Sequence, residues 1–296
     1  MPLLLAAAQE RGGLEPDLWS LHPEADARIR ARLERELAQP ERFGWVLAER
    51  GGEAVGVVSA GLFSAPPVYR SLLAGLSGDE LYAPDLEVLA ALLDEAEIFL
   101  RAGGAAVLTA ACPTRAAERL AHFTARGYRP LTLWMTRPVD PHTSRPPAVR
   151  PATEADLPAL VRLNAAAQEA KRRANPRFWT PHPDAPTRFE GWMRHSLTLA
   201  DRDVLVHEGP QGVDGFVVPQ PTGLPPAHDA AQLATLDDLA ADDWTAFGPL
   251  LEAAHQALAA RGVRTMQAIC PAGWPERRGV LEAAGFRTAN PWLLKD

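Results

Sequence analysis

The sequence predicts an α/β chain of the α+β type, built from two copies of one domain in which helices flank a twisted mixed sheet. One observation is the pattern of residues 235–270, where a helix-spaced apolar segment separates two short apolar runs, as in a β-α-β unit. The other is that the same pattern occurs 158 residues earlier, with Cys112 in the position of Cys270. A repeat of this length indicates two globular copies, because solenoid repeats are several-fold shorter.

Further matches keep nearly the same register near the start of each copy. Trp19 and His22 correspond to Trp179 and His182 at an offset of 160 residues. We interpret the two tryptophans as bracing two helices or as lining a substrate cleft. The chain therefore divides into a first domain, a Pro-rich polar linker and a second domain, at residues 1–138, 139–148 and 149–296.

Hydrophobic periodicity and turn residues predict the order of elements in the first copy. They are helices at 3–11 and 24–37, strands at 43–49, 54–62 and 71–76, a helix at 86–101, a strand at 105–111, a helix at 114–126 and a strand at 131–137. The second copy repeats this order but adds a strand at 148–151 and a capping box at 153–156. Without that strand, we expect the first sheet to expose an edge or to cover it with the other domain.

Composition excludes several classes of protein. A length of 296 residues suits two domains of ordinary size, and the net charge of −7 without a basic run argues against a nucleic-acid surface. The apolar start lacks a basic leader and is too short to span a membrane, so we expect a cytoplasmic protein without a membrane partner. We expect the protein to be monomeric or homodimeric. The two cysteines indicate neither a disulfide framework nor a metal site.

Three features together resemble the GNAT (Gcn5-related) N-acyltransferase superfamily. They are the opening VRPATEADLPALVRLNAAA, a hairpin whose second strand carries Gly215, and the closing pair Gly285-Phe286. The resemblance covers each half nearly from end to end, and it implies acyl transfer from acetyl-CoA, as co-substrate, to a small-molecule amine. In that fold the pantetheine arm fills a gap between two strands, and backbone N–H groups at a helix start hold the pyrophosphate.

The helix start of the second copy departs from the family's [QR]-x-x-G-x-[GA] pattern. Asp242 stands where the basic residue would be, and the first copy has Pro84 and Asp85 there and no glycine. A carboxylate about 4 Å from a phosphate costs between roughly 1 and 4 kcal/mol, depending on the effective dielectric constant. Asp242 and Asp243 are also ordinary helix caps. The candidate cofactor-binding residues in this region are Trp244, Thr245, Phe247 and Gly248.

The resemblance also directs attention to a general base. Candidates are Asp237 and Asp238, which we place at the end of the central strand, and His182 on a loop that could reach the acceptor side. For the aspartates, the alternative is a solvated strand end. For His182, the alternative is a structural role in the turn after the first helix, because His22 is its counterpart.

The family's acid is missing from both copies. The tyrosine expected four residues before the closing Gly-Phe is replaced by Phe123 and Leu281, and neither side chain can donate a proton. Cys112 and Cys270 are interpreted as small buried residues. Two functions remain open: an N-acyltransferase with its site in the second copy, or a non-catalytic relative that binds a ligand or acts as a scaffold.

Overall fold

Strands from both halves of the chain join in one sheet. The computed structural model describes residues 1–140 and 146–296, and residue 79 by its backbone alone. The strands of the first half are β1 (Phe43–Arg50), β2 (Glu53–Ser64), β3 (Leu73–Tyr82), β4 (Val107–Ala111) and β5 (Arg129–Pro138). Those of the second half are β6 (Val149–Pro151), β7 (Leu205–Gly209), β8 (Gly212–Pro221), β9 (Leu233–Ala241), β10 (Thr265–Pro271) and β11 (Arg287–Lys295). Within the described residues they form an eleven-stranded sheet in the order β1-β2-β3-β4-β11-β5-β10-β9-β8-β7-β6, which confirms the mixed α/β class.

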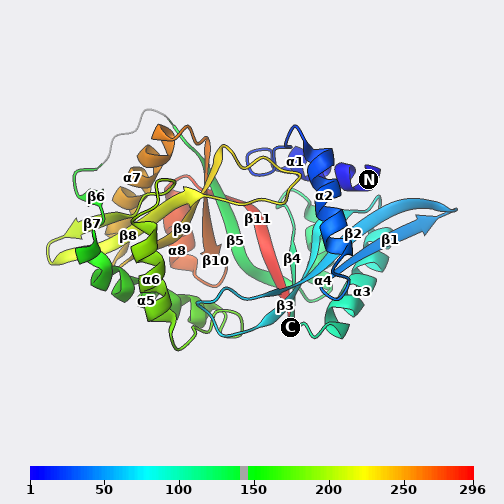
Figure 1. The fold of residues 1–296 in the computed structure, drawn as a ribbon, viewed down its shortest axis with the longest axis horizontal. Helices are drawn as coiled ribbons and strands as arrows, with labels where there is room; N and C mark the ends of the chain where they lie inside the picture. Colours follow the sequence, from blue (N-terminus) through cyan, green and yellow to red (C-terminus); the bar gives the residue numbers. More distant parts are fainter. Residues whose placement is uncertain (141–145) are drawn as a thin grey trace.

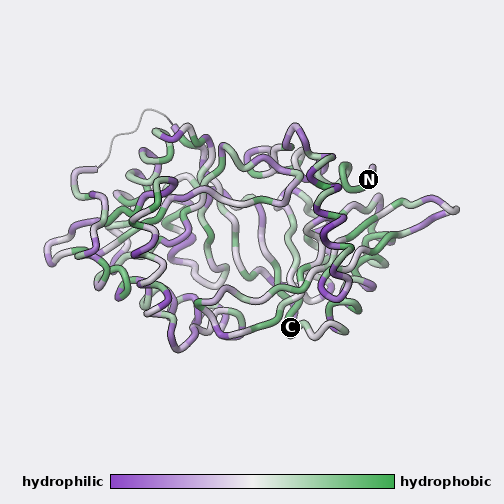
Figure 2. The backbone as a smooth tube through the Cα atoms, in the orientation of Figure 1, coloured by the Kyte–Doolittle hydropathy of each residue, from purple (hydrophilic) through white to green (hydrophobic). Residues whose placement is uncertain are grey.

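Helices cover both faces of this sheet. They are α1 (Pro2–Leu14), α2 (Ala25–Leu37), α3 (Leu86–Ala102), α4 (Ala117–Ala125), α5 (Leu157–Ala174), α6 (Ala185–Ser196), α7 (Phe247–Ala260) and α8 (Pro275–Ala283), with single 3-10 turns η1 (Glu154–Asp156) and η2 (Trp244–Ala246). Alternation along β8 assigns the faces, because Val217 packs with α7 whereas Phe216 and Val218 pack with α5 and α6. Figure 1 shows β4, β11, β5 and β10 between the two helical groups. Figure 2 shows hydrophobic residues along the strands and hydrophilic ones along α2.

The last strand of each half pairs with the other half. β5 lies between β11 and β10, and β11 lies between β4 and β5. The antiparallel β5–β11 ladder is symmetric, because Trp134 pairs with Asn290 and Thr132 pairs with Trp292. The predicted parallel pairs around the long helices are confirmed as β3–β4 and β9–β10. The exchange of the closing strands, which the sequence did not indicate, makes the two halves interdependent.

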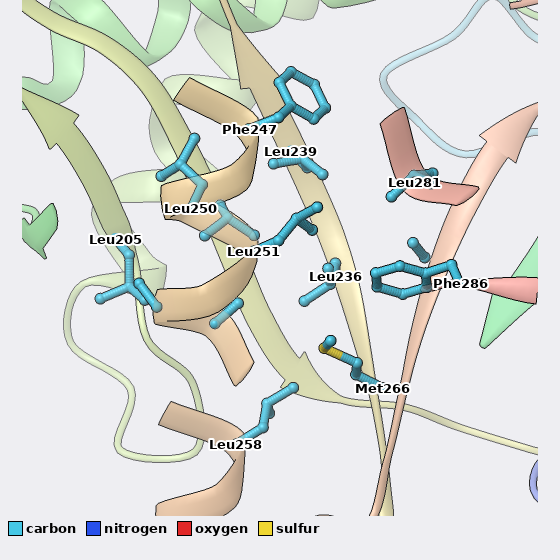
Figure 3. Close-up of a cluster of buried hydrophobic side chains, with 14 of the residues drawn as sticks. Leu205, Leu236, Leu239, Phe247, Leu250, Leu251, Leu258, Met266, Leu281 and Phe286 are labelled. Atoms are coloured by element: carbon cyan, nitrogen blue, oxygen red, sulfur yellow. The ribbon is translucent and has the colours of Figure 1, made fainter. Parts of the chain in front are cut away.

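The long helix of the second half, α7, packs through the residues that recur at helical spacing. Figure 3 shows Leu250, Leu251 and Leu258 along α7, with Met266 on the neighbouring strand at a height between Leu251 and Leu258. Gly215 on β8 permits this close approach, because a Cβ at that position would lie 2.8 Å from Leu250 Cδ1. The start of α7 is thereby held at a fixed place beside β9.

Two connections cross between the halves. Leu21, between α1 and α2, forms a β-bridge with His228 of the β8–β9 connection, and Tyr69 of the β2–β3 connection forms the equivalent bridge with Pro181. Trp19 is 2% exposed and packs beside His228, with ring centroids 5.1 Å apart. Trp19 therefore braces the two halves and does not line an open cleft.

The ends of the sheet differ between the halves. β6 pairs with β7 in the second half, whereas β1 is the terminal strand of the described sheet and pairs with β2 alone. Half of the linker expected at residues 139–148, namely residues 141–145, lies outside the described residues, so the domain boundaries stay a prediction. No helix in the described ranges is long and apolar enough to cross a membrane.

Candidate functional site

Two aspartates occupy a bulge in the middle of β9. The sequence placed Asp237 and Asp238 at the end of the strand, and this is wrong, because β9 continues past them to Ala241. Leu236 and Leu239 pair with residues only two apart on β8, so the two aspartates together face one residue of that strand. A bulge re-aims side chains out of the regular alternation. Both carboxylates can therefore face the side of the sheet that α5 covers.

The surroundings of the bulge perturb both carboxylates. Burial and the adjacent charge of Asp237 raise the pKa of Asp238 from 3.8 to about 6, and Lys171 and Arg277 oppose that rise. Burial also raises the pKa of Asp237, although its side chain reaches solvent, and Lys171 and Arg202 oppose it. Among the described residues, neither aspartate forms an ion pair. A partly protonated, unpaired carboxylate is suited to accept a proton near neutral pH.

A buried arginine lies where β9 and β10 separate. The two strands pair only over residues 233–236 and 265–268, and beyond them β9 bulges away. Arg277 of α8 is 3% exposed, and its Nη1 donates to the Leu239 carbonyl oxygen at 2.7 Å. The rings of Trp274 and Phe247 lie 5.3 and 5.8 Å from the guanidinium carbon. Nε of Arg277 has no hydrogen-bond partner among the described residues.

The counterpart of Asp238 in the first half is neutralised. Glu80 is the last residue of the β3 bulge, as Asp238 is the last residue of the β9 bulge. It is 1% exposed and accepts a hydrogen bond from Arg32 Nη1 at 3.2 Å. Arg32 also donates from Nε to Glu36 at 2.7 Å. The residue at the position of Arg32 in the second half is Trp192. The second half therefore keeps the carboxylate of the bulge and lacks the cation that pairs with it.

The counterpart of Arg277 is neutralised as well. Arg119 of α4 lies at the same position of the first half, and its Nη2 donates to the two carboxylate oxygens of Glu10 on α1 at 2.8 and 3.0 Å. Ala170 stands at the position of Glu10 in the second half. Arg277 has no such anion among the described residues, and its Nη1 donates instead to the Leu239 carbonyl oxygen of β9. Each half thus has a carboxylate in the bulge and an arginine on the following short helix, but within the described ranges only the first half holds each of these two groups in an ion pair.

The starts of the two long helices are capped by aspartates. Asp243 accepts a hydrogen bond from the N–H of Thr245 at 2.6 Å and another from the Thr245 hydroxyl. Asp85 caps α3 by accepting a hydrogen bond from the N–H of Val88 at 2.9 Å. Asp242 forms a bidentate ion pair with Arg162, at 2.6 and 2.8 Å. The capping interpretation is confirmed for Asp243, and the N–H group of Thr245 is not available to a phosphate.

The other residues predicted to bind a cofactor differ in how accessible they are to a ligand. Phe247 is 2% exposed in the core next to Leu239, as Figure 3 shows, so its side chain cannot contact a ligand outside that core. Trp244 is half-exposed and lies edge-on to Trp274 at 6.1 Å. Gly248 faces open space, because a Cβ there would meet no atom within 4 Å. Trp244 and Gly248 are the two that could touch a ligand at the mouth of the gap.

His182 serves the turn before α6. Its Nδ1 accepts the backbone N–H of Asp184 at 3.1 Å, and its Nε2 lies 3.3 Å from Arg188 Nη2. His22 accepts the N–H of Glu24 at 3.0 Å in the equivalent turn. His182 is not among the groups that shift the pKa of either aspartate. The structure therefore gives His182 the shared structural role and does not place it with Asp237 and Asp238.

Both cysteines are buried thiols. The Sγ atoms of Cys112 and Cys270 contact the carbonyl oxygens of Pro113 and Pro271, and burial raises the pKa of each thiol to about 11. A thiol with so high a pKa is a poor nucleophile at neutral pH. Within the described ranges, no group of three or more His, Cys, Asp or Glu side chains could hold a metal ion.

Two clefts open at the helix ends. One, of about 410 Å³, lies between the starts of α3 and α4 in the first half and is lined by Glu10, Ala83, Pro84, Asp85, Leu86, Leu89, Arg115, Ala116, Ala117, Glu118 and Arg119. The other, of about 650 Å³, lies beside the end of α5. At the position of Ala116 the second half has Trp274, whose ring flanks Arg277. The small side chain of Ala116 therefore leaves space at the start of α4 that the larger Trp274 occupies at the start of α8.

Solved structures resemble the whole chain. A GCN5-related N-acetyltransferase from Sphaerobacter thermophilus matches 99% of this chain and 90% of its own, with a TM-score of 0.57 and 17% identity. An acetyltransferase of the GNAT family from Colwellia psychrerythraea matches 84% of each chain, with a TM-score of 0.50 and 12% identity. The chain has the GNAT fold. No family model and no curated protein matches the sequence.

The GNAT fold explains the arrangement but not the reaction. Likeness at 12 to 17% identity shows a shared backbone arrangement, and one fold supports many functions. A tandem GNAT protein from the clavulanic acid biosynthesis pathway also matches, over 86% of this chain and 82% of its own at 17% identity, but its TM-score of 0.47 adds nothing to the assignment. The chemistry has to be argued from the side chains at the split of β9 and β10.

Sequence reasoning missed Arg277 and Lys171. A signal for Arg277 was present, because the internal repeat aligns it with Arg119 and aligns the anionic Glu10 with Ala170. When both copies have the arginine but only the first has its glutamate partner, the arginine of the second copy is a candidate for a different role. That signal becomes visible only when the contact between Arg119 and Glu10 is known, because the two residues are 109 positions apart in the chain.

Proposed function

We propose that the chain transfers an acyl group from an acyl-CoA-type thioester to a small-molecule amine, and that the reaction takes place in the second half. The supporting observation is that a carboxylate and an arginine at the split of β9 and β10 have no ion-pair partners in the part of the chain that the structure describes. Asp238 and Arg277 each lack an ion pair among the described residues, whereas their counterparts Glu80 and Arg119 are both paired. Arg277 is buried and Asp238 is partly buried, and an uncompensated charge in such a place costs stability, so its retention favours a functional role.

Asp238 is the proposed general base. An amine attacks a thioester as the neutral species, so a nearby group has to take up a proton. A carboxyl whose pKa is about 6 is ionised at pH 7 and is a stronger base than an ordinary aspartate. Asp237 raises that pKa and adds negative charge, which favours a cationic amine as the acceptor.

The acceptor side of the bulge is lined by polar groups. Lys171 of α5 influences both aspartates and lies 3.5 Å from the hydroxyl of Tyr69, which comes from the first half. Gln168, one turn before Lys171, has a buried Oε1 atom without a partner among the described residues. These groups suit a small acceptor that carries polar groups besides its amine. Tyr69 comes from the first half, so both halves contribute side chains to these surroundings.

The residues fit the thioester arm of a donor better than its nucleotide. The unsatisfied Nε of buried Arg277 offers a hydrogen-bond donor inside the gap. At the helix start, by contrast, Asp243 already accepts from Thr245, and its ionised carboxylate would face a diphosphate. Arg277, Trp244 and Gly248 would hold the donor, which supplies the activated acyl group.

The experiment is a product search with the full-length protein. The protein is incubated with acetyl-CoA and a mixture of amino acids, polyamines and amino sugars, and N-acetylated products are identified by mass spectrometry while free thiol is measured. We expect one acetylated amine, formed in step with thiol release. No product and no thiol release beyond the protein-free control, at millimolar acetyl-CoA, would contradict the proposal.

A second candidate is binding without turnover in the first half. The cleft of about 410 Å³ at the starts of α3 and α4 supports it, because it corresponds to the mouth of the equivalent gap. Ala116→Trp introduces the residue that the second half has at this place and fills the cleft. Loss of CoA binding in Ala116→Trp, measured by calorimetry, with product formation absent in the wild-type protein, would favour this candidate.

A further inference from the structure

The gap between β9 and β10 contains a cation where the fold family has an acid. Leu281 and Arg277 are the two buried residues of α8, and they lie one turn apart on the same face of the helix. Leu281 stands at the position of the missing tyrosine and cannot donate a proton. We infer that Arg277 takes over the missing step by stabilising the departing thiolate as an anion, an inference that rests on the proposed function.

The geometry around Arg277 supports this role. The guanidinium has one hydrogen bond, to the Leu239 carbonyl oxygen, and its Nε is free among the described residues. Trp274 and Phe247 flank it and exclude water, so that its charge acts through a medium of low dielectric constant. Asp238 is close enough for Arg277 to lower its pKa. A base and a cation thus flank the place where a thioester would react.

The step balances without any further reactant. An acceptor that arrives as an ammonium ion first loses one proton to solvent. As the nitrogen of the resulting neutral amine bonds to the carbonyl carbon, Asp238 accepts one N–H proton. The C–S bond breaks, and its electron pair stays on sulfur. Arg277 remains protonated and interacts with the resulting thiolate, which leaves as an anion. The amide, the thiolate and protonated Asp238 are the products of the step, and Asp238 then returns its proton to solvent.

The test varies the leaving thiol. Acetyl thioesters of an alkyl thiol and of a more acidic aryl thiol are compared in the wild-type protein and in Arg277→Met, with the amine found in the product search. We expect Arg277→Met to lower kcat/KM about a hundredfold with the alkyl thioester. With the aryl thioester, whose thiolate needs little stabilisation, we expect a loss of less than about tenfold. Equal losses with both donors would overturn the inference, because a structural defect would not distinguish them.

A binding measurement provides a readout without turnover. The thiol of CoA is titrated in complex with the protein through the ultraviolet absorbance of its thiolate. We expect a thiol pKa at least about 1 unit lower in the wild-type complex than in Arg277→Met, corresponding to a tenfold preference for the anion. An unshifted pKa in the wild-type complex would overturn the inference.

Two further variants serve as controls. Arg119→Met removes the counterpart in the first half, and it should change neither the leaving-thiol dependence nor the thiol pKa. Arg277→Lys keeps a cation, so with the alkyl thioester it should be more active than Arg277→Met. If Arg277→Met does not fold and Arg277→Lys is also inactive, the result counts against the inference. Absence of turnover by the wild-type protein would contradict the proposed function itself, which the product search detects separately.

Discussion

Trp134 on β5 stacks on Trp292 on β11, with ring centroids 5.9 Å apart and ring planes inclined by 18°. The two tryptophans are counterparts at the repeat offset of 158 residues. They lie on the two exchanged strands, at the centre of the symmetric β5–β11 ladder. The stack therefore joins the two halves at the place where each depends on the other's last strand.

The exchange predicts cooperative unfolding. Trp134→Ala should destabilise the whole chain by roughly 3 kcal/mol, because a large aromatic side chain is removed from a packed contact. A single urea transition, shifted in both halves, is expected in fluorescence and in hydrogen exchange. Two urea transitions, of which only one has a lower midpoint in Trp134→Ala than in the wild-type protein, would show that the halves fold independently.

Asp238 should reduce stability at neutral pH. Its pKa is raised from 3.8 to about 6, so the native state binds more protons than the unfolded state between these values, and stability falls as pH rises through that window. Asp238→Asn should therefore raise the free energy of unfolding at pH 7.5, on the order of 2 kcal/mol, and the gain should vanish below about pH 4. Urea denaturation at the two pH values measures this difference.

The matched control for that variant is Glu80→Gln. Glu80 is paired with Arg32, so removing its charge should give no gain and a small loss, while the pair of Arg32 and Glu36 remains. A gain in Glu80→Gln equal to that in Asp238→Asn would contradict the asymmetry between the halves.

The pH dependence of acyl transfer should follow Asp238. The base is active when ionised, so kcat/KM should rise with pH around a midpoint near 6. Asp237→Asn should move the midpoint lower, because the charge of Asp237 raises the pKa of Asp238, while burial and the cations Lys171 and Arg277 remain. Rate profiles from pH 5 to 8 test this, and an unmoved midpoint in Asp237→Asn would argue for another base.

Donor specificity should depend on Asp243. In the wild-type protein, acetyl-pantetheine and acetyl-CoA should have kcat/KM values within about tenfold of each other, because the helix start does not favour a diphosphate. Asp243→Ser keeps the cap and removes the charge, so it should strengthen CoA binding several-fold without affecting pantetheine. Asp85→Ser, its counterpart, should leave both affinities unchanged. Calorimetry with the two thiols distinguishes these outcomes.

Local patterns accounted for most elements but not for the way they join. The capping box at Thr153 and Asp156 and the helical spacing of Leu250 and Leu251 are confirmed, because short-range residue patterns determine them. The exchange of β5 and β11 depends on pairing between distant residues, and no local pattern contains it. The strand order could not be read for the same reason.

The candidate site was predicted in part. The aspartates of β9 were recognised, but their place in the middle of the strand was not, because a bulge is determined by pairing with β8. His182 has a loop position typical of both a base and a turn residue, and only its contact with Asp184 decides between them. Arg277 was missed because its alignment with Arg119 becomes informative only when the contact between Arg119 and Glu10 is known.

The rate of acyl transfer in Asp238→Asn relative to Glu80→Gln tests the central claim most directly. Both variants exchange a carboxylate for an amide at the corresponding position of the two bulges, and they differ in which half is altered and in whether the carboxylate is ion-paired. We predict that Asp238→Asn loses at least about a hundredfold in kcat/KM with acetyl-CoA and the identified amine, while Glu80→Gln stays within about threefold of the wild-type protein. Equal rates for Asp238→Asn and the wild-type protein, or a loss confined to Glu80→Gln, would contradict a reaction in the second half.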